Sequence, residues 1–468
     1  MLKSDWKKIG KRILFFVPLI AGTAGYLTSG EKITDALYAG MTLYGFNSVS
    51  SDYNIYIEFA RWTAPIAAGA VIVSAFHGLW NTLHWRFRLF GRKDSVAVYS
   101  DEDIKIKFDK KTKVIYPGEE FKGYAKSHII LFSSDQESLQ FYQKNKEALA
   151  GKKVYIGLRE LESGLTEDIR NVTLFDVSGS VARLLWKDLA LWKMGKNELN
   201  VVIYGNHMLA QQILSVGLHQ NLYSLKQKVH YYFVSDNPLF QIRHKDIDLM
   251  NGDTVTYYET SDDKAWDAIS VADRVIIADQ TGLDLLQTVA VKAKDGSKIY
   301  YYSPKEGDAA EYISFGNMIP FGREARIFTD RNIRQQKLVK SAIALNGYYS
   351  GIDYKNEGSE EKQKKLQDKW KKLDGFLKAS NISAADYGTV IAKLSKKVSV
   401  EELAQLEHMR WCRFYYLNYW KSGDTKDELK RIHRDLIPYG KLDPAEKRKD
   451  IKNVQMFCDA GKKSKNNV

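Results

Sequence analysis

The hydrophobic residues of this chain fall into two long uncharged runs followed by many short ones. Residues 13–28 (ILFFVPLIAGTAGYLT) and 62–83 (WTAPIAAGAVIVSAFHGLWNTL) contain no charged side chain. A helix of about 20 predominantly apolar residues spans the ~30 Å of a bilayer core. The flanks of the runs are basic and their connection is acidic, so the positive-inside rule predicts two spans, about 10–29 and 62–85, with both termini cytoplasmic. The alternative is a cleaved signal peptide followed by one span.

The segment between the two runs has a helical pattern of apolar residues. In residues 33–47 (ITDALYAGMTLYGFN) these recur at spacings of four, four and three. The order of span, short helix, T-L-Y-G-F and span resembles the pore module of a two-span potassium channel. The resemblance implies pore candidates at Thr42, Tyr44, Gly45 and, on the second run, His77. The second filter glycine is missing, and the alternative is an interfacial helix that caps the loop.

From residue 95 onward, short β-type runs alternate with helical stretches. Runs such as SVAVYS, HIILF and VTLF have the length of buried strands. Strands that alternate with helices are typical of parallel sheets built from βαβ units. We therefore expect two Rossmann-like domains, residues 94–196 and 197–330, after a transmembrane unit of residues 1–93. The first strand is followed by S-D-E-D, whose three acids and lack of glycine disfavour a phosphate, so the first domain is expected to be degenerate and structural.

The second α/β domain carries a partial nucleotide-binding motif. Residues 200–214 (NVVIYGNHMLAQQIL) predict a strand, a turn and a helix, as in the G-x-G-x-x-G motif. His207 replaces the middle glycine, which normally lets a pyrophosphate approach closely. The candidate nucleotide-binding residues are Gly205, Asn206, His207, Ala210 and Asp236. Residues 95–330 resemble tandem TrkA-N domains of bacterial channels, a family that binds NAD or other nucleotides. The alternative is a scaffold that binds nothing.

The C-terminal region, residues 331–468, is predicted to be helical and contains the most specific motif. Residues 403–411 read LAQLEHMRW, a second Trp follows nine residues later, and residues 433–442 read HRDLIPYGKL. This pattern resembles the RyR domain, which is named for the ryanodine receptor and also occurs alone in bacteria. The glycine that usually precedes the second Trp is Tyr419 here.

Aromatic rings and cationic donors in this region suit a ligand with a base and a phosphate. The candidate ligand-binding residues are Glu407, His408, Arg410, Trp411, Trp420, Arg431, His433 and Tyr439. The alternative is a small helical domain in which the Trp residues form the core and the Glu–Arg pairs are structural.

Composition narrows the classes of function. The 468 residues include 70 Lys+Arg and 57 Asp+Glu, a net charge of +13, spread over mixed-charge helices and the flanks of the two runs. No nucleic-acid partner is therefore expected. With only Cys412 and Cys458, a disulfide-rich secreted scaffold is excluded. No Ser-His-Asp, Cys-His or paired-carboxylate arrangement stands out, so we expect neither an enzyme nor a metal site.

Together, the patterns predict two transmembrane helices followed by α/β Rossmann-like domains with a parallel sheet and a C-terminal all-α RyR-type domain. This order resembles a recurring bacterial architecture associated with nucleotide-signal systems, including phage defence. The resemblance implies a protein of the bacterial inner membrane, in which a nucleotide-type ligand gates a pore in the lipid bilayer. Two spans cannot enclose a pore alone, so a homo-oligomer, with a tetramer favoured, is expected. The alternatives are a potassium-selective channel regulated by an NAD-type nucleotide and a membrane-anchored NAD(P)-dependent oxidoreductase.

Overall fold

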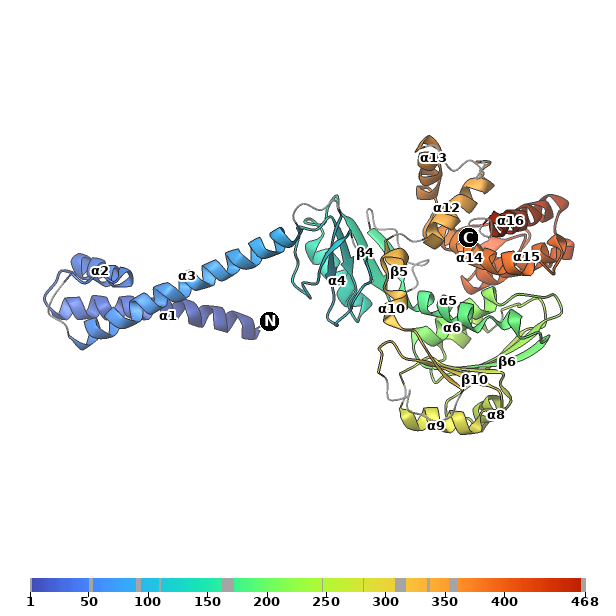
Figure 1. Cartoon of the computed structure of the whole chain (residues 1–468), viewed down its shortest axis with the longest axis horizontal. Coiled ribbons are helices and arrows are strands. Elements are labelled where there is room, and N and C mark those ends of the chain that lie inside the picture. The colour runs from blue at the N-terminus through green and yellow to red at the C-terminus, as the bar shows by residue number, and fades with distance from the viewer. Residues whose placement is uncertain are drawn as a thin grey trace. The chain divides into compact units, whose positions relative to one another are not determined.

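The chain divides into two compact units, residues 1–91 and 92–468, which are described separately (Figure 1). A computed structural model describes residues 2–49, 54–89, 94–108, 111–161, 172–245, 247–280, 282–307, 317–334, 337–352 and 360–463.

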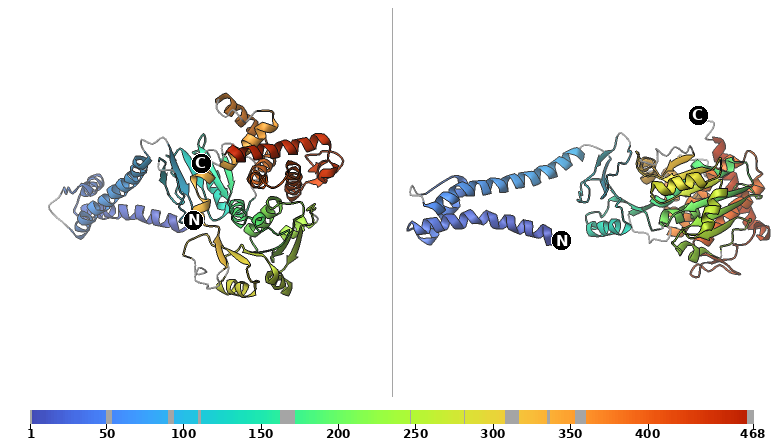
Figure 2. Two further views of the ribbon diagram at one scale, coloured as in Figure 1. Left: turned by 45° about the vertical axis from the view of Figure 1, so that its right-hand side comes forward. Right: turned by 90° about the horizontal axis from the view of Figure 1, so that it is seen from below.

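The described residues of the N-terminal unit form three helices and one 3-10 turn. Helices α1 (Leu2–Thr28) and α3 (Ile55–Leu89) lie side by side, and α2 (Ile33–Thr42) packs against α1 (Figure 2). Small residues make this approach possible, since a Cβ on Gly25 would lie only 2.6 Å from the Ile57 side chain. Many large apolar side chains of this unit remain exposed, among them Ile20, Trp62 and Phe76.

The prediction of two membrane spans, and with it that of an inner-membrane location, is wrong. Within the residues that the structure describes, no helix combines the length and the sustained hydropathy needed to cross a bilayer. Helix α1 reaches 27 residues only by including a basic N-terminal third, and its uncharged part has 16 residues. Helix α3 includes the charged Glu58 and Arg61 in its first turns. The uncharged part of α1 is therefore shorter than the ~20 residues that span a bilayer core.

The pore candidates lie in a closed helical turn. Thr42 ends α2, and Leu43–Gly45 forms a 3-10 turn. The carbonyl of Thr42 accepts a hydrogen bond from the backbone N–H of Asn47, and the Tyr44 hydroxyl donates to the Phe15 carbonyl. A selectivity filter needs consecutive carbonyls that face an axis, and this turn does not have that form. The side chain of His77 lies outside the described part of the structure.

The first sheet of the second unit is fully parallel. Its strands are β1 (Ser95–Tyr99), β2 (Lys113–Ile115), β3 (Ser127–Ile130), β4 (Lys153–Leu158) and β5 (Val172–Asp176), in the order β2-β1-β3-β4-β5. Helices α4 (Asp135–Asn145) and α5 (Val177–Leu189) follow β3 and β5. This is the flavodoxin-like order of a doubly wound sheet, and the predicted parallel α/β architecture is confirmed.

The second sheet is also parallel and has the dinucleotide-fold order, β11-β10-β9-β6-β7-β8. Its strands are β6 (Glu198–Tyr204), β7 (Lys228–Val234), β8 (Thr254–Tyr258), β9 (Arg274–Ile277), β10 (Lys298–Tyr302) and β11 (Met318–Phe321). Its helices are α6 (Met208–Gln220), α7 (Leu239–His244), α8 (Asp263–Val271) and α9 (Leu283–Lys292), and short helices α10 (Glu324–Ile327) and α11 (Asp330–Ile333) follow β11. A shared core joins the two sheets, because Trp186 of α5 packs in it and donates to the Ile213 carbonyl of α6 at 2.8 Å.

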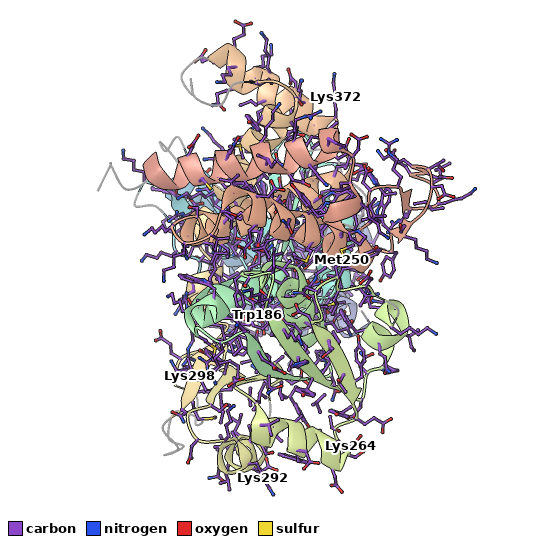
Figure 3. All side chains as sticks on the ribbon, turned by 90° about the vertical axis from the view of Figure 1, so that its right-hand side faces the viewer. Trp186, Met250, Lys264, Lys292, Lys298 and Lys372 are labelled. Carbon is purple, nitrogen blue, oxygen red and sulfur yellow. The ribbon has the colours of Figure 1, made fainter. Side chains whose placement is uncertain are left out.

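The C-terminal part is helical and rests on the second sheet domain. It contains α12 (Lys337–Tyr349), α13 (Glu360–Lys371), α14 (Gly375–Leu394), α15 (Val400–Leu417) and α16 (Pro444–Lys463), with the two-residue strands β12 (Lys421–Ser422) and β13 (Ile432–His433). Figure 3 shows these helices above α6, with Met250 at the junction. Met250 packs against two hydrophobic clusters of the helical part. The predicted helical C-terminal domain is therefore part of a larger, packed unit.

Candidate functional site

The sequence motif E-H-x-R-W lies on one continuous helix, α15. Ser399 caps its N-terminus by accepting the backbone N–H of Glu402 at 3.2 Å, and Glu401 and Glu402 occupy the first turn. Acidic side chains are favoured there by the helix dipole. The chain leaves the helix at Tyr419, whose φ of 66° is left-handed. Glycine adopts that conformation most easily, which explains why a glycine is usual at this position.

Two of the predicted ligand-binding residues pair with each other in the interior. Arg410 donates to both carboxylate oxygens of Glu407, at 2.8 and 2.9 Å, and to the Ser383 hydroxyl at 2.9 Å. The two side chains are 1% and 3% exposed. This bidentate geometry satisfies both charges, so these residues cannot reach a ligand without breaking a buried pair.

Arg413, which the sequence analysis did not single out, links α15 to the second sheet domain through hydrogen bonds. It is fully buried and donates to the carbonyls of Leu218 and Leu249, to the Asn251 side chain and to the Asp253 carboxylate at 2.9 Å. One sequence signal was available, because Arg413 follows Arg410 by three residues and so shares its helix face.

Residues that precede the motif reinforce the same junction. The Tyr387 hydroxyl donates to the Leu222 carbonyl at 2.6 Å, and Gln220 donates to the Ser383 carbonyl at 3.1 Å. Asp386 lies 2.6 Å from Lys187 of α5. These contacts join α14 and α15 to α5 and α6, so much of the motif stabilises an interface within the chain.

His408 is held in a buried polar cluster with Cys412 and Asp450. Its Nε2 lies 2.7 Å from the Ile437 carbonyl and 3.4 Å from Cys412 Sγ, and its Nδ1 lies 3.4 Å from Asp450. Burial alone would lower the pKa of His408, but hydrogen bonds to Asp450 and Cys412 raise it to about 10. The cluster resembles a nucleophile–base–acid arrangement. However, a charged imidazole cannot accept a proton, and burial raises the pKa of the Cys412 thiol.

The aromatic candidates form a packed cluster rather than an open slot. Trp411 lies 4.3 Å from Tyr415 and 5.0 Å from His433, and Trp420 stacks on Phe376 at 5.2 Å, measured between ring centroids. Trp420 and Tyr439 are buried, whereas Trp411, Arg431 and His433 are half-buried. Only these three of the eight predicted residues present part of their surface to solvent.

A cationic and aromatic edge therefore remains accessible beside β12 and β13. We call it the ribbon edge and define it as Trp411, Tyr419, Arg431, His433 and Arg434. Arg431 has a left-handed φ of 54° and donates to the Asn418 carbonyl at 2.8 Å, with its guanidinium 6.0 Å from the Tyr419 ring centre. Among the described residues, no carboxylate lies within 4 Å of this guanidinium. Left-handed non-glycine residues are uncommon and cluster at functional sites.

The five residues predicted to hold a nucleotide in the second sheet do come together. Gly205, Asn206 and His207 follow β6, Ala210 lies in the first turn of α6, and Asp236 follows β7. Asn206 accepts the backbone N–H of Asp236 at 2.7 Å through its side-chain oxygen. However, the backbone N–H groups of Asn206 and His207 both point to the carboxylate of Asp279, at 2.7 and 3.4 Å. Sequence analysis did not single out Asp279.

The comparison with known families agrees with the motif on α15. Residues 384–459 match the RyR domain family. The matched range runs from the middle of α14 to the last turns of α16, so the RyR domain includes the ribbon edge and the Arg413 contact. The two parallel sheets are the part of the TrkA-N expectation that the structure supports, and no TrkA-N match was found. No curated protein and no solved structure matches the chain.

Proposed function

We propose that the protein is a sensor whose RyR domain binds a nucleotide-type ligand at the ribbon edge. The observation that carries the proposal is the division of α15 into two sides. Arg410 and Arg413 are buried against other elements, while Trp411 borders the half-buried edge, where the Arg431 guanidinium has no carboxylate partner among the described residues. One helix thus connects an accessible cationic surface to the α/β core.

The chemistry of the edge favours an anion that carries a flat ring. Trp411 and His433 offer aromatic surface, and Arg431 and Arg434 offer planar guanidinium donors. The Arg434 side chain is 63% exposed, with Asp435 at 3.5 Å. Guanidinium groups bind phosphates in a forked geometry that an ammonium group lacks. A base against Trp411 with a phosphate near Arg431 would use both features.

Ligand binding is coupled to the rest of the chain through α15 in this proposal. Arg413 is two residues from Trp411 on the same helix and contacts the carbonyls of Leu218 in α6 and of Leu249 before β8. A ligand that binds one arrangement of α15 better than another shifts the population of the α/β core with it. A homo-oligomeric assembly stays a prediction.

A sensing role without catalysis suits the buried groups best. His408 and Cys412 are the only nucleophile–base neighbours in the described helical domain, and the protonation argued above makes them unsuitable for nucleophilic attack. The alternative of an NAD(P)-dependent oxidoreductase gains no support from the glycine turn, whose donors contact Asp279.

The proposal is tested by equilibrium titration of the full chain with a panel of adenine and guanine mono- and dinucleotides. Arg431→Gln should weaken binding by about 10- to 100-fold, because a charge-assisted hydrogen bond contributes ~1.5–3 kcal/mol. Lys365→Gln on α13 is the matched control, since Lys365 is exposed and pairs with Glu361 of the same helix. Equal affinities for the two variants would contradict the proposal. Trp411→Ala is less useful, because Trp411 also packs on Tyr415.

A further inference from the structure

The second sheet has the strand order of a dinucleotide fold, and its expected ligand position can be located. The order reverses between β6 and β9, and ligands of such sheets bind outside the carboxyl ends of the strands at this reversal. The loops there are Gly205–His207, after β6, and Ala278–Gln280, after β9. Phosphates normally accept the free N–H groups at the start of the following helix, here α6.

An internal carboxylate occupies those donors. Asp279 accepts the N–H of Asn206 at 2.7 Å, with the N–H of His207 at 3.4 Å, and so lies at the positive end of the 13-residue helix α6. Gly205 permits this approach, because a Cβ there would lie 2.9 Å from Asp279 and 3.0 Å from Ala210. The glycine that suggested a pyrophosphate site therefore admits a side chain of the same protein.

The neighbouring acidic residue is also held by hydrogen bonds within the chain. Asp236, predicted to hold a ribose hydroxyl, accepts the backbone N–H of Thr260 at 2.9 Å and the Thr260 hydroxyl at 2.7 Å. Hydrogen bonds from Thr260 lower the pKa of Asp236, so its charge is retained at neutral pH. Asn206 contacts both residues, because its side-chain oxygen accepts the backbone N–H of Asp236 and its own backbone N–H donates to the Asp279 carboxylate. A pyrophosphate placed at these N–H groups would meet the Asp279 carboxylate.

The first sheet repeats this arrangement independently. Its order reverses between β1 and β3. Asp101, after β1, accepts the backbone N–H of Ser133, after β3, at 2.8 Å. Burial alone would raise the pKa of Asp101, but the hydrogen bonds from Ser133 lower it, so this group is also an anion.

We infer that both sheets close their ligand crevices with their own carboxylates, and that Asp279 takes the place of a dinucleotide phosphate in the second. The crevice then accepts no dinucleotide, whether or not the RyR domain binds a ligand. Removing the Asp279 carboxylate frees two N–H donors at a helix N-terminus. Asp279→Ala is therefore expected to create an anion site that the natural chain lacks.

The test uses the full chain and two probes, NADH and inorganic phosphate. The natural protein and Gly205→Val are compared by NADH fluorescence titration. Any saturable NADH binding to the natural protein should persist in Gly205→Val, because it would not use the crevice. Asp279→Ala should unfold at a lower temperature than Asp295→Ala, a matched control at an exposed turn. Phosphate should raise the unfolding temperature of Asp279→Ala by several degrees more than that of the natural chain at equal ionic strength.

Three results would overturn the inference. They are saturable NADH binding that Gly205→Val removes, equal unfolding temperatures for Asp279→Ala and Asp295→Ala, and no added phosphate response in Asp279→Ala. Should Asp279→Ala fail to fold, Asp279→Asn retains one acceptor oxygen and replaces it in the thermal comparison. The NADH titration needs no substitution at Asp279, so it does not depend on whether the Asp279 variants fold.

Discussion

The motif helix of the RyR domain and the glycine turn of the second sheet were both predicted as ligand sites from sequence motifs. Their structures differ. Both bring the predicted residues together. At the glycine turn, the N–H groups that could hold a phosphate contact Asp279. On α15, Glu407 and Arg410 are equally enclosed, yet Trp411, Arg431 and His433 remain half-buried. A sequence can thus have the form of a binding motif where its groups bind each other, and the accessibility of those groups separates the two cases.

The largest expected effect comes from the contact that joins the two regions. Arg413→Met should destabilise the unit by about 3–5 kcal/mol, because it leaves the Asp253 carboxylate buried without its partner. Urea unfolding of the full chain measures the change. Arg434→Gln, at an exposed position, should change the free energy of unfolding by less than ~0.5 kcal/mol. If the two variants are equally stable, Arg413 does not fasten α15 to the sheet.

The next effect is on the pH dependence of stability, which should be opposite for the histidines of the α/β part and for His408 of the RyR domain. In the α/β part, burial lowers the pKa of His128 to about 4, of His219 to about 3 and of His244 to about 4. Their contribution to stability is present above the unfolded pKa of ~6.5 and is lost as the pH falls toward those values. The pKa of His408 is raised instead. Its contribution to stability is therefore present below pH ~6.5 and is lost as the pH rises toward about 10.

The alkaline half of this prediction is measured by unfolding at pH ~7 and ~9. The natural chain should lose stability over this interval, and His408→Gln should lose much less, because it carries no proton to release. Parallel losses in the two proteins would show that His408 is not held protonated by Asp450 and Cys412.

A smaller effect is expected at the glycine turn itself. Gly205→Ala should destabilise the chain by about 1–3 kcal/mol, because its Cβ meets Asp279 and Ala210 at distances that force a shift. Gly440→Ala is the control, since a Cβ there meets no atom within 4 Å. Thermal unfolding compares the two. A neutral Gly205→Ala would mean that Asp279 does not approach the turn as described.

The smallest effect concerns the strained residue of the ribbon edge. Tyr419→Gly and Tyr419→Ala both remove the ring that stacks on His244 at 5.4 Å, but only glycine relieves the left-handed backbone. Tyr419→Gly should therefore be more stable than Tyr419→Ala by ~1 kcal/mol, measured by urea unfolding. The reverse order would show that the position is not strained.

Sequence patterns predicted the elements well where periodicity and local signals agree. The alternation of strands and helices indicated two parallel sheets, and the E-H-x-R-W motif located the RyR domain on a helix. The membrane prediction failed at the first run because its uncharged part of 16 residues is shorter than the ~20 residues that span a bilayer core. Helix α1 starts at Leu2, within a basic segment.

The partners of buried polar groups could not be predicted in the same way. Asp279 is 74 residues from Gly205, and Asp253 is 160 residues from Arg413. No local spacing connects such residues. The strand order of the second sheet brings Asp279 to the Gly205 turn, and the packing of α15 on the sheet domain brings Arg413 to Asp253. The aromatic cluster was misjudged for a related reason, since Phe376 of α14, which covers Trp420, lies outside the motif.

The central claim is that a nucleotide-type ligand binds at the ribbon edge and not in the crevice of the second sheet. Native mass spectrometry of the full chain, incubated with the nucleotide panel, tests it most directly. We predict a bound nucleotide on the natural chain and on Gly205→Ala, with occupancy reduced about tenfold or more in Arg431→Gln. A nucleotide that persists in Arg431→Gln but is lost from Gly205→Ala would contradict the account.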